Sequence, residues 1–230
     1  MILNKSSKIY LSGHKGLIGS AILRRLRSQN YSNIITKNKS QLDLRDQKKV
    51  FNFLKKIKPD AVIIAAAKVG GIKANNLKKA EFIYENLAIQ NNLIHGSYLA
   101  GVKNLIFLGS SCVYPKNCKQ PIKEKYLLSG YLEDTNEPYA IAKIAGIKLC
   151  EALIKQKGFQ AICLMPTNLY GPGDNYHKLN SHVLPSLINK FSYAKNKDLN
   201  NVICWGDGSP LREFLYVDDL AEACIFTINN

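Results

Sequence analysis

Tyr139 and Lys143 stand four residues apart in the string Tyr-Ala-Ile-Ala-Lys, a spacing that puts two residues on one face of a helix. An unperturbed phenol titrates near pH ~10 and is a poor acid-base group at neutral pH. One ammonium ~4 Å away, at an effective dielectric constant of ~20, favours the ionised phenol by ~4 kcal/mol, or about three pKa units, before burial takes some of this back. The pair therefore predicts a proton-donating tyrosine whose pKa the lysine lowers.

Ser110 and Cys112 supply two further groups upstream of this pair, just after an apolar run. Ser110 can donate a hydrogen bond to a substrate carbonyl, and Cys112 adds a thiol where the substrate should lie. Lys143 can also hold the ribose of a nicotinamide cofactor. Together these side chains indicate an enzyme that acts on a carbonyl group.

A glycine turn near the start has the spacing Gly13-x-x-Gly16-x-x-Gly19. It lies between an expected strand and an expected helix, so a pyrophosphate could approach its backbone and meet free N–H groups at the helix N-terminus. A purely structural turn is the alternative. The candidate cofactor contacts here are Gly13, His14, Lys15, Gly16, Leu17, Ile18 and Gly19.

Charge after the second expected strand favours NADP(H) over NAD. An NAD site usually places a carboxylate there, whereas a 2′-phosphate needs cations. Here the strand runs into Lys37, Asn38 and Lys39, and Lys15 lies in the glycine turn. The first acid, Asp43, is better placed to meet the adenine edge. Lys39 and Lys15 as ordinary surface lysines remain the alternative.

The expected elements alternate through most of the chain, and this alternation predicts an α/β fold with a doubly wound parallel sheet. The expected strands are residues 8–12, 33–36, 61–67, 105–109 and 161–165, and the expected helices are 17–27, 47–57, 79–100 and 139–157. Ser110 would lie at the end of the strand that precedes the Tyr139 helix.

The regular alternation of strands and helices ends after Pro166. We expect a turn-rich stretch at 169–174, a helix near 182–193, strands at 202–205 and 214–217, and a last helical segment. We therefore predict a cofactor-binding domain over residues 1–168 and a smaller, incomplete substrate-binding part over 169–230 that partly returns to the sheet.

The composition of the chain argues against several other classes of protein. The 230 residues carry 32 basic and 17 acidic side chains, but the lysines are dispersed and no basic-aromatic array suggests nucleic acid. Six cysteines form no C-x-x-C pair, so neither a metal site nor a disulfide framework is expected. No signal-like or membrane-spanning run appears, and a cytoplasmic location is expected.

Seven strings resemble the GDP-L-fucose synthases, a family of extended short-chain dehydrogenase/reductases with a Rossmann sheet. They are residues 13–19, 65–71, 108–115, 136–143, 165–171, 180–183 and 212–214. The Tyr-Lys and glycine motifs belong to the superfamily, while Ser-Ser-Cys at 110–112 and Asn-Ser-His at 180–182 point to this member. The resemblance covers the whole chain.

The resemblance implies a two-step reaction. GDP-4-keto-6-deoxy-D-mannose would be epimerised at C3 and C5, with Cys112 as base and His182 as acid. NADPH-dependent reduction at C4 would follow, with Tyr139 as proton donor and Lys143 as activator.

The resemblance also implies contacts and a partner. Further cofactor contacts would be Leu108, Gly109, Ser110, Ser111, Pro166, Thr167, Asn168, Leu169 and His182, and contacts to the GDP-sugar would be Lys190, Trp205 and Arg212. A homodimer would form through the helices at 79–100 and 139–157.

Family members continue past the position of Asn230, so the chain is expected to be a fragment, a shortened silent protein, or one completed by another polypeptide. Two alternative functions stay open. One is an NAD-dependent nucleotide-sugar 4-epimerase or dehydratase, and the other is a catalytically silent NADP-binding protein.

Overall fold

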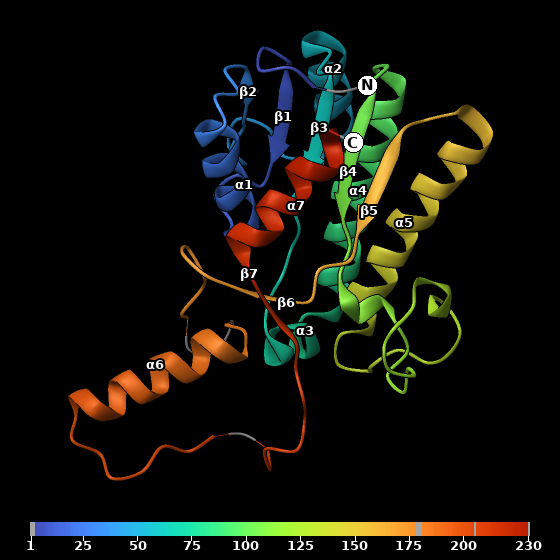
Figure 1. Cartoon of the computed structure of the whole chain (residues 1–230). Coiled ribbons are helices and arrows are strands. Elements are labelled where there is room, and N and C mark those ends of the chain that lie inside the picture. Colours follow the sequence, from blue (N-terminus) through green and yellow to red (C-terminus); the bar gives the residue numbers. More distant parts are fainter. Residues whose placement is uncertain (1–2, 178–180, 205, 230) are drawn as a thin grey trace.

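The computed structural model describes residues 3–177, 181–204 and 206–229. Its main sheet has five parallel strands in the order β2-β1-β3-β4-β5, which confirms the predicted doubly wound arrangement. The strands are β1 (Ile9–Ser12), β2 (Ile34–Ile35), β3 (Ala61–Ile64), β4 (Asn104–Leu108) and β5 (Ala161–Leu164). Figure 1 shows the sheet with helices on both of its faces.

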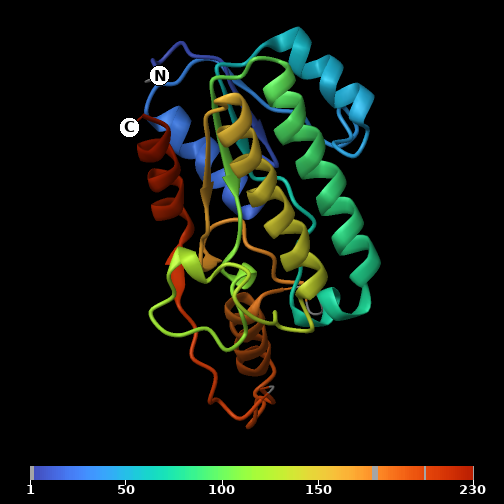
Figure 2. The ribbon, with the colours of Figure 1, turned by 90° about the vertical axis from the view of Figure 1, so that its right-hand side faces the viewer.

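Alternating side chains of the strands build two cores. Ile9 and Leu11 of β1 face a core shared with α1 (Leu17–Ser28) and α7 (Val217–Asn229). Tyr10 of the same strand faces the opposite core, which α2 (Gln47–Ile57), α4 (Lys79–Leu99) and α5 (Glu137–Lys157) cover. Figure 2 shows α4 and α5 packed side by side on that second face. The sheet is therefore buried on both sides, as its apolar strands predict.

Local signals explain the helix ends that matter for the site. The side chain of Asp46 caps α2 by accepting a hydrogen bond from the backbone N–H of Lys49 at 3.0 Å. α5 begins two residues before the expected start, with Pro138 in its first turn, and ends at Gly158 in a left-handed conformation with φ of 64°. Tyr139 therefore sits in the first turn of α5.

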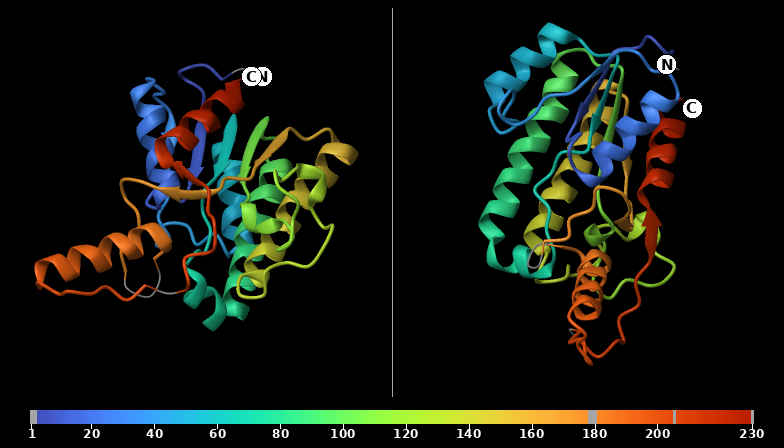
Figure 3. Two further views of the ribbon diagram at one scale, coloured as in Figure 1. Left: turned by 60° about the horizontal axis from the view of Figure 1, so that its bottom comes forward. Right: turned by 90° about the vertical axis from the view of Figure 1, so that its left-hand side faces the viewer.

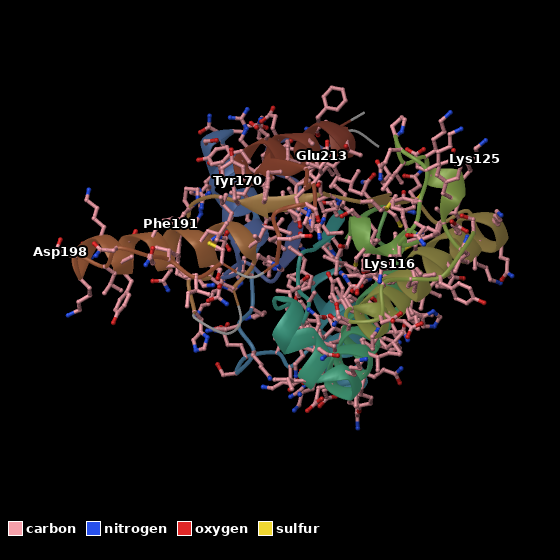
Figure 4. The ribbon with its side chains drawn as sticks, turned by 90° about the horizontal axis from the view of Figure 1, so that it is seen from below. Lys116, Lys125, Tyr170, Phe191, Asp198 and Glu213 are labelled. Carbon is pink, nitrogen blue, oxygen red and sulfur yellow. The ribbon has the colours of Figure 1, made fainter. Side chains whose placement is uncertain are left out.

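The region after Pro166 leaves the sheet and partly returns to it. β6 (Asn168–Tyr170) and β7 (Phe214–Tyr216) pair in parallel as a separate two-stranded sheet, and α7 then packs against α1. Between them α6 (Val183–Asn196) projects from the body, as Figures 1 and 3 show. We call this projecting helix the arm. Figure 4 places Phe191 on the arm and Asp198 beyond its last turn, away from Lys116 and Lys125 in the segment before α5.

Three elements differ from the sequence expectation. The strand expected at 202–205 is wrong over 202–204, which has no regular structure, and Trp205 lies outside the described residues. The helix α3 (Ile72–Leu77) and the strand β6 were not expected. Two 3-10 turns, η1 (Ser111–Val113) and η2 (Glu124–Tyr126), complete the elements of the described part. No described helix has the length and apolar character that crossing a bilayer requires.

Candidate active site

The glycine turn joins β1 to α1. Its glycines differ in whether the fold itself leaves room for a side chain. Gly13 has φ of +77°, and a Cβ there would lie 2.6 Å from the backbone nitrogen of Ala66. A Cβ on Gly19 would clash with the carbonyl oxygen of Gly13. Gly16 differs, because its φ is −81° and a Cβ there would meet nothing closer than 3.5 Å. The protein itself requires glycine at 13 and 19, whereas the space beside Gly16 is left open.

The open side of this turn faces the N-terminus of α1. Gly16 provides no side-chain cap, and the first turn of α1 has no acidic residue. Its free N–H groups and the positive end of the helix dipole suit an anion. His14 adds a buried Nδ1 atom that has no hydrogen-bond partner in the described part of the chain. An open glycine cradle and an unpaired buried nitrogen fit a dinucleotide.

We predict opposite outcomes for two alanine substitutions in this turn. Gly16→Ala should leave the free energy of unfolding unchanged within ~0.5 kcal/mol and weaken NADPH binding at least ~10-fold, because the new methyl group occupies the ligand's space. Gly19→Ala should lower the free energy of unfolding by ~1–3 kcal/mol, because it overlaps backbone. Urea titration and NADPH fluorescence titration measure the two effects. Equal NADPH affinity in wild type and Gly16→Ala would contradict this assignment.

Lys39 lies among charged side chains rather than alone. Arg45 donates to Asp43, with Nη2 2.7 Å from the carboxylate, and this bond lowers the Asp43 pKa to about 2. The charge of Lys39 acts in the same direction on Asp43 and on Glu85. Glu85 also pairs with Lys68 and, at 3.5 Å, with Arg45. The sequence reasoning missed Arg45 and Glu85, because no motif marks a pair that only the fold brings together.

Ser110 and Cys112 lie at the carboxyl end of β4. Ser110 caps η1, where its Oγ accepts a hydrogen bond from the backbone N–H of Cys112 at 3.4 Å. The Cys112 thiol also hydrogen-bonds to Ser110. Burial raises the pKa of Cys112, while that hydrogen bond and the charge of Lys143 oppose the rise. Tyr139 is close enough for the charge of Cys112 to act on its pKa. The structure thus brings Ser110, Cys112, Tyr139 and Lys143 together.

Lys143 is buried, with only 3% of its surface exposed. Its Nζ donates a hydrogen bond to the carbonyl oxygen of Leu108 at 2.7 Å and lies 4.7 Å from the centroid of the Phe107 ring. Burial lowers the Lys143 pKa to about 8, against the charges of Cys112 and Cys163. The lysine is therefore held at the end of β4, within reach of the Tyr139 ring.

The pKa of Tyr139 shifts in the direction opposite to the predicted one. Burial, and then the charge of Cys112, raise the pKa of Tyr139 above its usual value. The reason lies in the position of the ammonium, which binds Leu108 and lies 5.8 Å from the Tyr139 ring centroid. At that distance its attraction does not offset desolvation of the phenolate. Tyr139 is accordingly a protonated phenol at neutral pH.

The buried lysine predicts a pH-dependent stability. Its pKa is about 8 in the folded protein, below the ordinary lysine value of 10.5 that holds in the unfolded chain. Above pH 8 the unfolded state therefore binds more protons, and stability rises toward pH 10. We expect wild type to gain ~2 kcal/mol over Lys143→Met between pH 7.5 and pH 9.5. Urea titrations of both proteins at pH 7.5, 8.5 and 9.5 measure the difference. Parallel stability curves for the two proteins would refute it.

His182 lies at the N-terminal end of α6, in front of Val183, and the residue as a whole is exposed. Protein atoms around its imidazole ring still desolvate the charged form and lower its pKa, while the charge of Asp174 opposes the shift. The interactions described for His182 involve Asp174 and Ser186, and they do not include Cys112 or Tyr139. Asp174 was not predicted, because a single acid in a turn carries no sequence signal. Asn180 of the same motif lies outside the described residues.

Backbone hydrogen bonds join the two expected cofactor segments. The N–H of Gly109 donates to the carbonyl oxygen of Leu164 at 2.8 Å, and the N–H of Ser111 donates to that of Pro166 at 3.1 Å. Thr167 and Asn168 point their side chains elsewhere, because both donate to the carbonyl oxygen of Glu213 at the start of β7. These two residues therefore hold β6 and β7 together.

The expected contacts to the GDP-sugar are spread over the arm and the loop after it. The Nζ of Lys190 donates to the carbonyl oxygen of Ile203 at 3.0 Å. Arg212 is exposed, and its Nη1 donates to the carbonyl oxygen of Leu211 at 2.8 Å. In the described ranges, no group of three or more His, Cys, Asp or Glu side chains could hold a metal ion.

Comparison with known proteins agrees with this geometry. The model of the NAD dependent epimerase/dehydratase family matches residues 9–230. A putative GDP-L-fucose synthase of Arabidopsis thaliana is 57% identical over 228 residues, covering 99% of this chain and 70% of the relative.

Two solved structures extend the likeness to three dimensions. A GDP-L-fucose synthetase of Naegleria fowleri bound to NADP superposes with a TM-score of 0.88 at 32% identity, over 100% of this chain and 75% of that one. A GDP-mannoheptose C4 reductase of Campylobacter jejuni with NADP bound gives a TM-score of 0.91 at 38% identity, over 99% and 76% of the two chains. The chain therefore belongs to the NAD dependent epimerase/dehydratase family and, within it, to the GDP-L-fucose synthases.

Proposed function

We propose that this chain converts GDP-4-keto-6-deoxy-D-mannose to GDP-L-fucose by 3,5-epimerisation and NADPH-dependent reduction at C4. The observation that carries the proposal is the meeting of the Cys112 thiol with Ser110, Tyr139 and Lys143 at the end of β4. A simple carbonyl reductase needs the serine, the tyrosine and the lysine, but it has no use for a thiol at this place. The thiol is what an epimerisation step adds.

The epimerisation follows from the acidity of the two carbons beside the ketone. Ser110 and Tyr139 donate hydrogen bonds to the C4 oxygen and stabilise the enolate that forms when a proton leaves. Cys112 takes the proton from one face of the ring. His182, with a lowered pKa, returns a proton from the other face. Inversion at C3 and C5 requires such a pair on opposite sides, and α6 must bring His182 to the ring for the second half.

The reduction uses the same hydrogen bonds. NADPH, when bound, supplies a hydride to C4. Tyr139 then donates its proton to the C4 oxygen, a role that its raised pKa suits because the phenol is protonated at neutral pH. Lys143 holds the cofactor ribose and stabilises the phenolate left after transfer. The names of the NADP-bound relatives support NADP(H) as the cofactor.

Residues 169–230 are proposed to bind the GDP-sugar, with Lys190, Trp205 and Arg212 as contacts. The cofactor contacts given above, from the glycine turn, Lys39 and the segments 108–111 and 166–169, are part of the same proposal. Support comes from the position of β6, which continues directly from the segment bonded to Ser111.

A homodimer through α4 and α5 is also proposed. Large apolar side chains are exposed on both helices, among them Tyr84 (69% exposed), Leu99 (45%) and Ile154 (40%). Light scattering behind a sizing column should then give twice the chain mass of 25.7 kDa. A cytoplasmic location fits the six unpaired cysteines.

Purified chain incubated with the 4-keto-6-deoxy GDP-sugar and NADPH tests the activity. Cofactor oxidation together with GDP-L-fucose as product is the expected result. A product that is reduced at C4 but not inverted at C3 and C5 would show that the chain is a reductase without epimerase activity. NADPH binding without oxidation or proton exchange would instead indicate a silent cofactor-binding protein.

A further inference from the structure

Two thiols outside the catalytic cluster lie next to each other, one on a helix and one on the strand beneath it. Cys150 lies on α5 and is completely buried, and Cys163 lies on β5 and is partly exposed. One hydrogen bond joins the two thiols, with Cys150 as the donor and Cys163 as the acceptor. The mechanism proposed above uses neither of them.

Packing between α5 and the sheet explains the pairing. Gly146 of α5 lies over Phe107, since a Cβ there would come within 2.6 Å of the ring. Cys163 is the register partner of Phe107 on the neighbouring parallel strand, so both side chains point toward α5. Cys150 follows Gly146 by one helical turn on the same face. The close packing of α5 on the sheet therefore places the two cysteines next to each other.

A cavity gives small molecules access to the pair. Cys150 and Cys163 both line a space of about 200 Å³, together with Ile147, Met165 and Val113. β5 is an edge strand of the sheet, and Cys163 keeps some exposure to solvent whereas Cys150 has none. Cys163 is therefore the member of the pair that a small reagent can reach.

The two thiols are also unequal in acidity. The hydrogen bond from Cys150 lowers the pKa of Cys163, and the charge of Lys143 acts in the same direction, against burial and Glu151. Cys150 is the donor, and its pKa is raised. Because the thiolate is the nucleophile in thiol chemistry, Cys163 is the member of the pair that attacks.

We propose that Cys150 and Cys163 form a redox-reactive dithiol that closes to a disulfide between α5 and β5. The oxidant is a low-molecular-weight disulfide. The Cys163 thiolate attacks one of its sulfur atoms, forms a mixed disulfide and releases one thiolate, which takes a proton. Cys150 then loses its proton and attacks the sulfur of Cys163, which releases the second thiol. In total two protein thiols and one disulfide give one protein disulfide and two small thiols.

Closing this bond must move the catalytic helix. The two sulfur atoms have to approach from hydrogen-bond separation to about 2.05 Å, and α5 shifts toward β5 as they do. Cys150 stands seven residues after Lys143 on the same side of α5. Displacements of about 1 Å at catalytic groups can cost ~10²-fold in rate. The oxidised protein should therefore turn over more slowly, and this part alone rests on the proposed function.

The disulfide is tested by mass, independently of activity. Purified protein is treated with 2-hydroxyethyl disulfide, its remaining thiols are alkylated, and it is digested with trypsin. Cys150 and Cys163 fall in separate peptides, 149–155 and 158–178, each with one cysteine. We expect these two peptides joined as the main cross-link, at least tenfold above any other pair, with Cys112 in peptide 104–116 still alkylated.

Two variants serve as controls for the cross-linking experiment. Cys150→Ala should leave Cys163 as a mixed disulfide, while Cys224→Ala, which removes a buried cysteine from the opposite face of the sheet, should cross-link like wild type. A dominant cross-link between other cysteines overturns the proposal. The proposal is also overturned if no Cys150–Cys163 cross-link forms under conditions that convert the exposed Cys204 fully to its mixed disulfide.

Turnover is then measured on the cross-linked fraction. We expect a loss of ~10²-fold that dithiothreitol reverses, and no loss in treated Cys163→Ala. Cross-linked protein that turns over at the reduced protein's rate would overturn the coupling to α5 while leaving the dithiol established. A protein with no turnover in any state would fail the proposed function, and the peptide masses would still decide on the disulfide.

Discussion

Tyr139→Phe is expected to lower the rate of NADPH oxidation with the 4-keto sugar by about 10³-fold, within the range typical of a lost general acid. The substitution removes one hydroxyl and keeps the ring that lies near the Lys143 ammonium. NADPH affinity and the free energy of unfolding should therefore stay close to those of wild type. Stopped-flow absorbance at the cofactor band measures the rate, and fluorescence titration measures the affinity.

The matched control for that variant is Tyr131→Phe. Tyr131 is 95% exposed in the segment before α5, so its hydroxyl lies in solvent and not among buried groups. It should retain the wild-type rate. A Tyr139→Phe enzyme that reduces the ketone within tenfold of wild type would show that another group protonates the C4 oxygen.

Cys112→Ser is expected to stop the first step and spare the second. A hydroxyl in place of the thiol is a far weaker base precursor, so exchange of the C3 and C5 protons with solvent should fall ~10²- to 10⁴-fold. Ser110 and Tyr139 remain in place, so reduction at C4 should continue on the sugar that has not been inverted. Incubation in D2O, with the product analysed by mass and by NMR, separates the two steps.

Cys118→Ser serves as the control for the thiol. Cys118 is a partly exposed cysteine a few residues further along the same segment, and its loss should leave exchange unchanged. Full exchange in Cys112→Ser would exclude the thiol as the base. His182→Asn belongs in the same experiment, because it should allow removal of the proton but block its return to the opposite face.

The sequence predicted the sheet and the catalytic cluster because both depend on local patterns. Apolar runs such as those in β3 and β4 identify buried parallel strands wherever they stand, and four-residue spacing places Tyr139 and Lys143 on one helix face. The carboxyl ends of neighbouring strands then meet at one edge, which brings Ser110 to that helix.

Other features depended on the surroundings of each side chain and could not be read from spacing. The pKa of Tyr139 follows from where the Lys143 ammonium points and from how completely the phenol is buried. The pairing of Arg45 with Glu85 joins a loop to α4. β6 has no apolar run of its own and forms only because β7 returns beside it. The interaction of His182 with Asp174 arises in the same way.

The position of α7 has a consequence for synthesis on the ribosome. Arg24 of α1 bonds to Asp218 of α7 across 194 residues of sequence, and Val217 and Leu220 share the core with Ile9 and Leu11. At ~5–20 residues per second, the first helix waits roughly 10–40 s for its partner to be translated. During that time the apolar surface that α7 will cover, on α1 and on the same face of the nascent sheet, stays exposed to solvent.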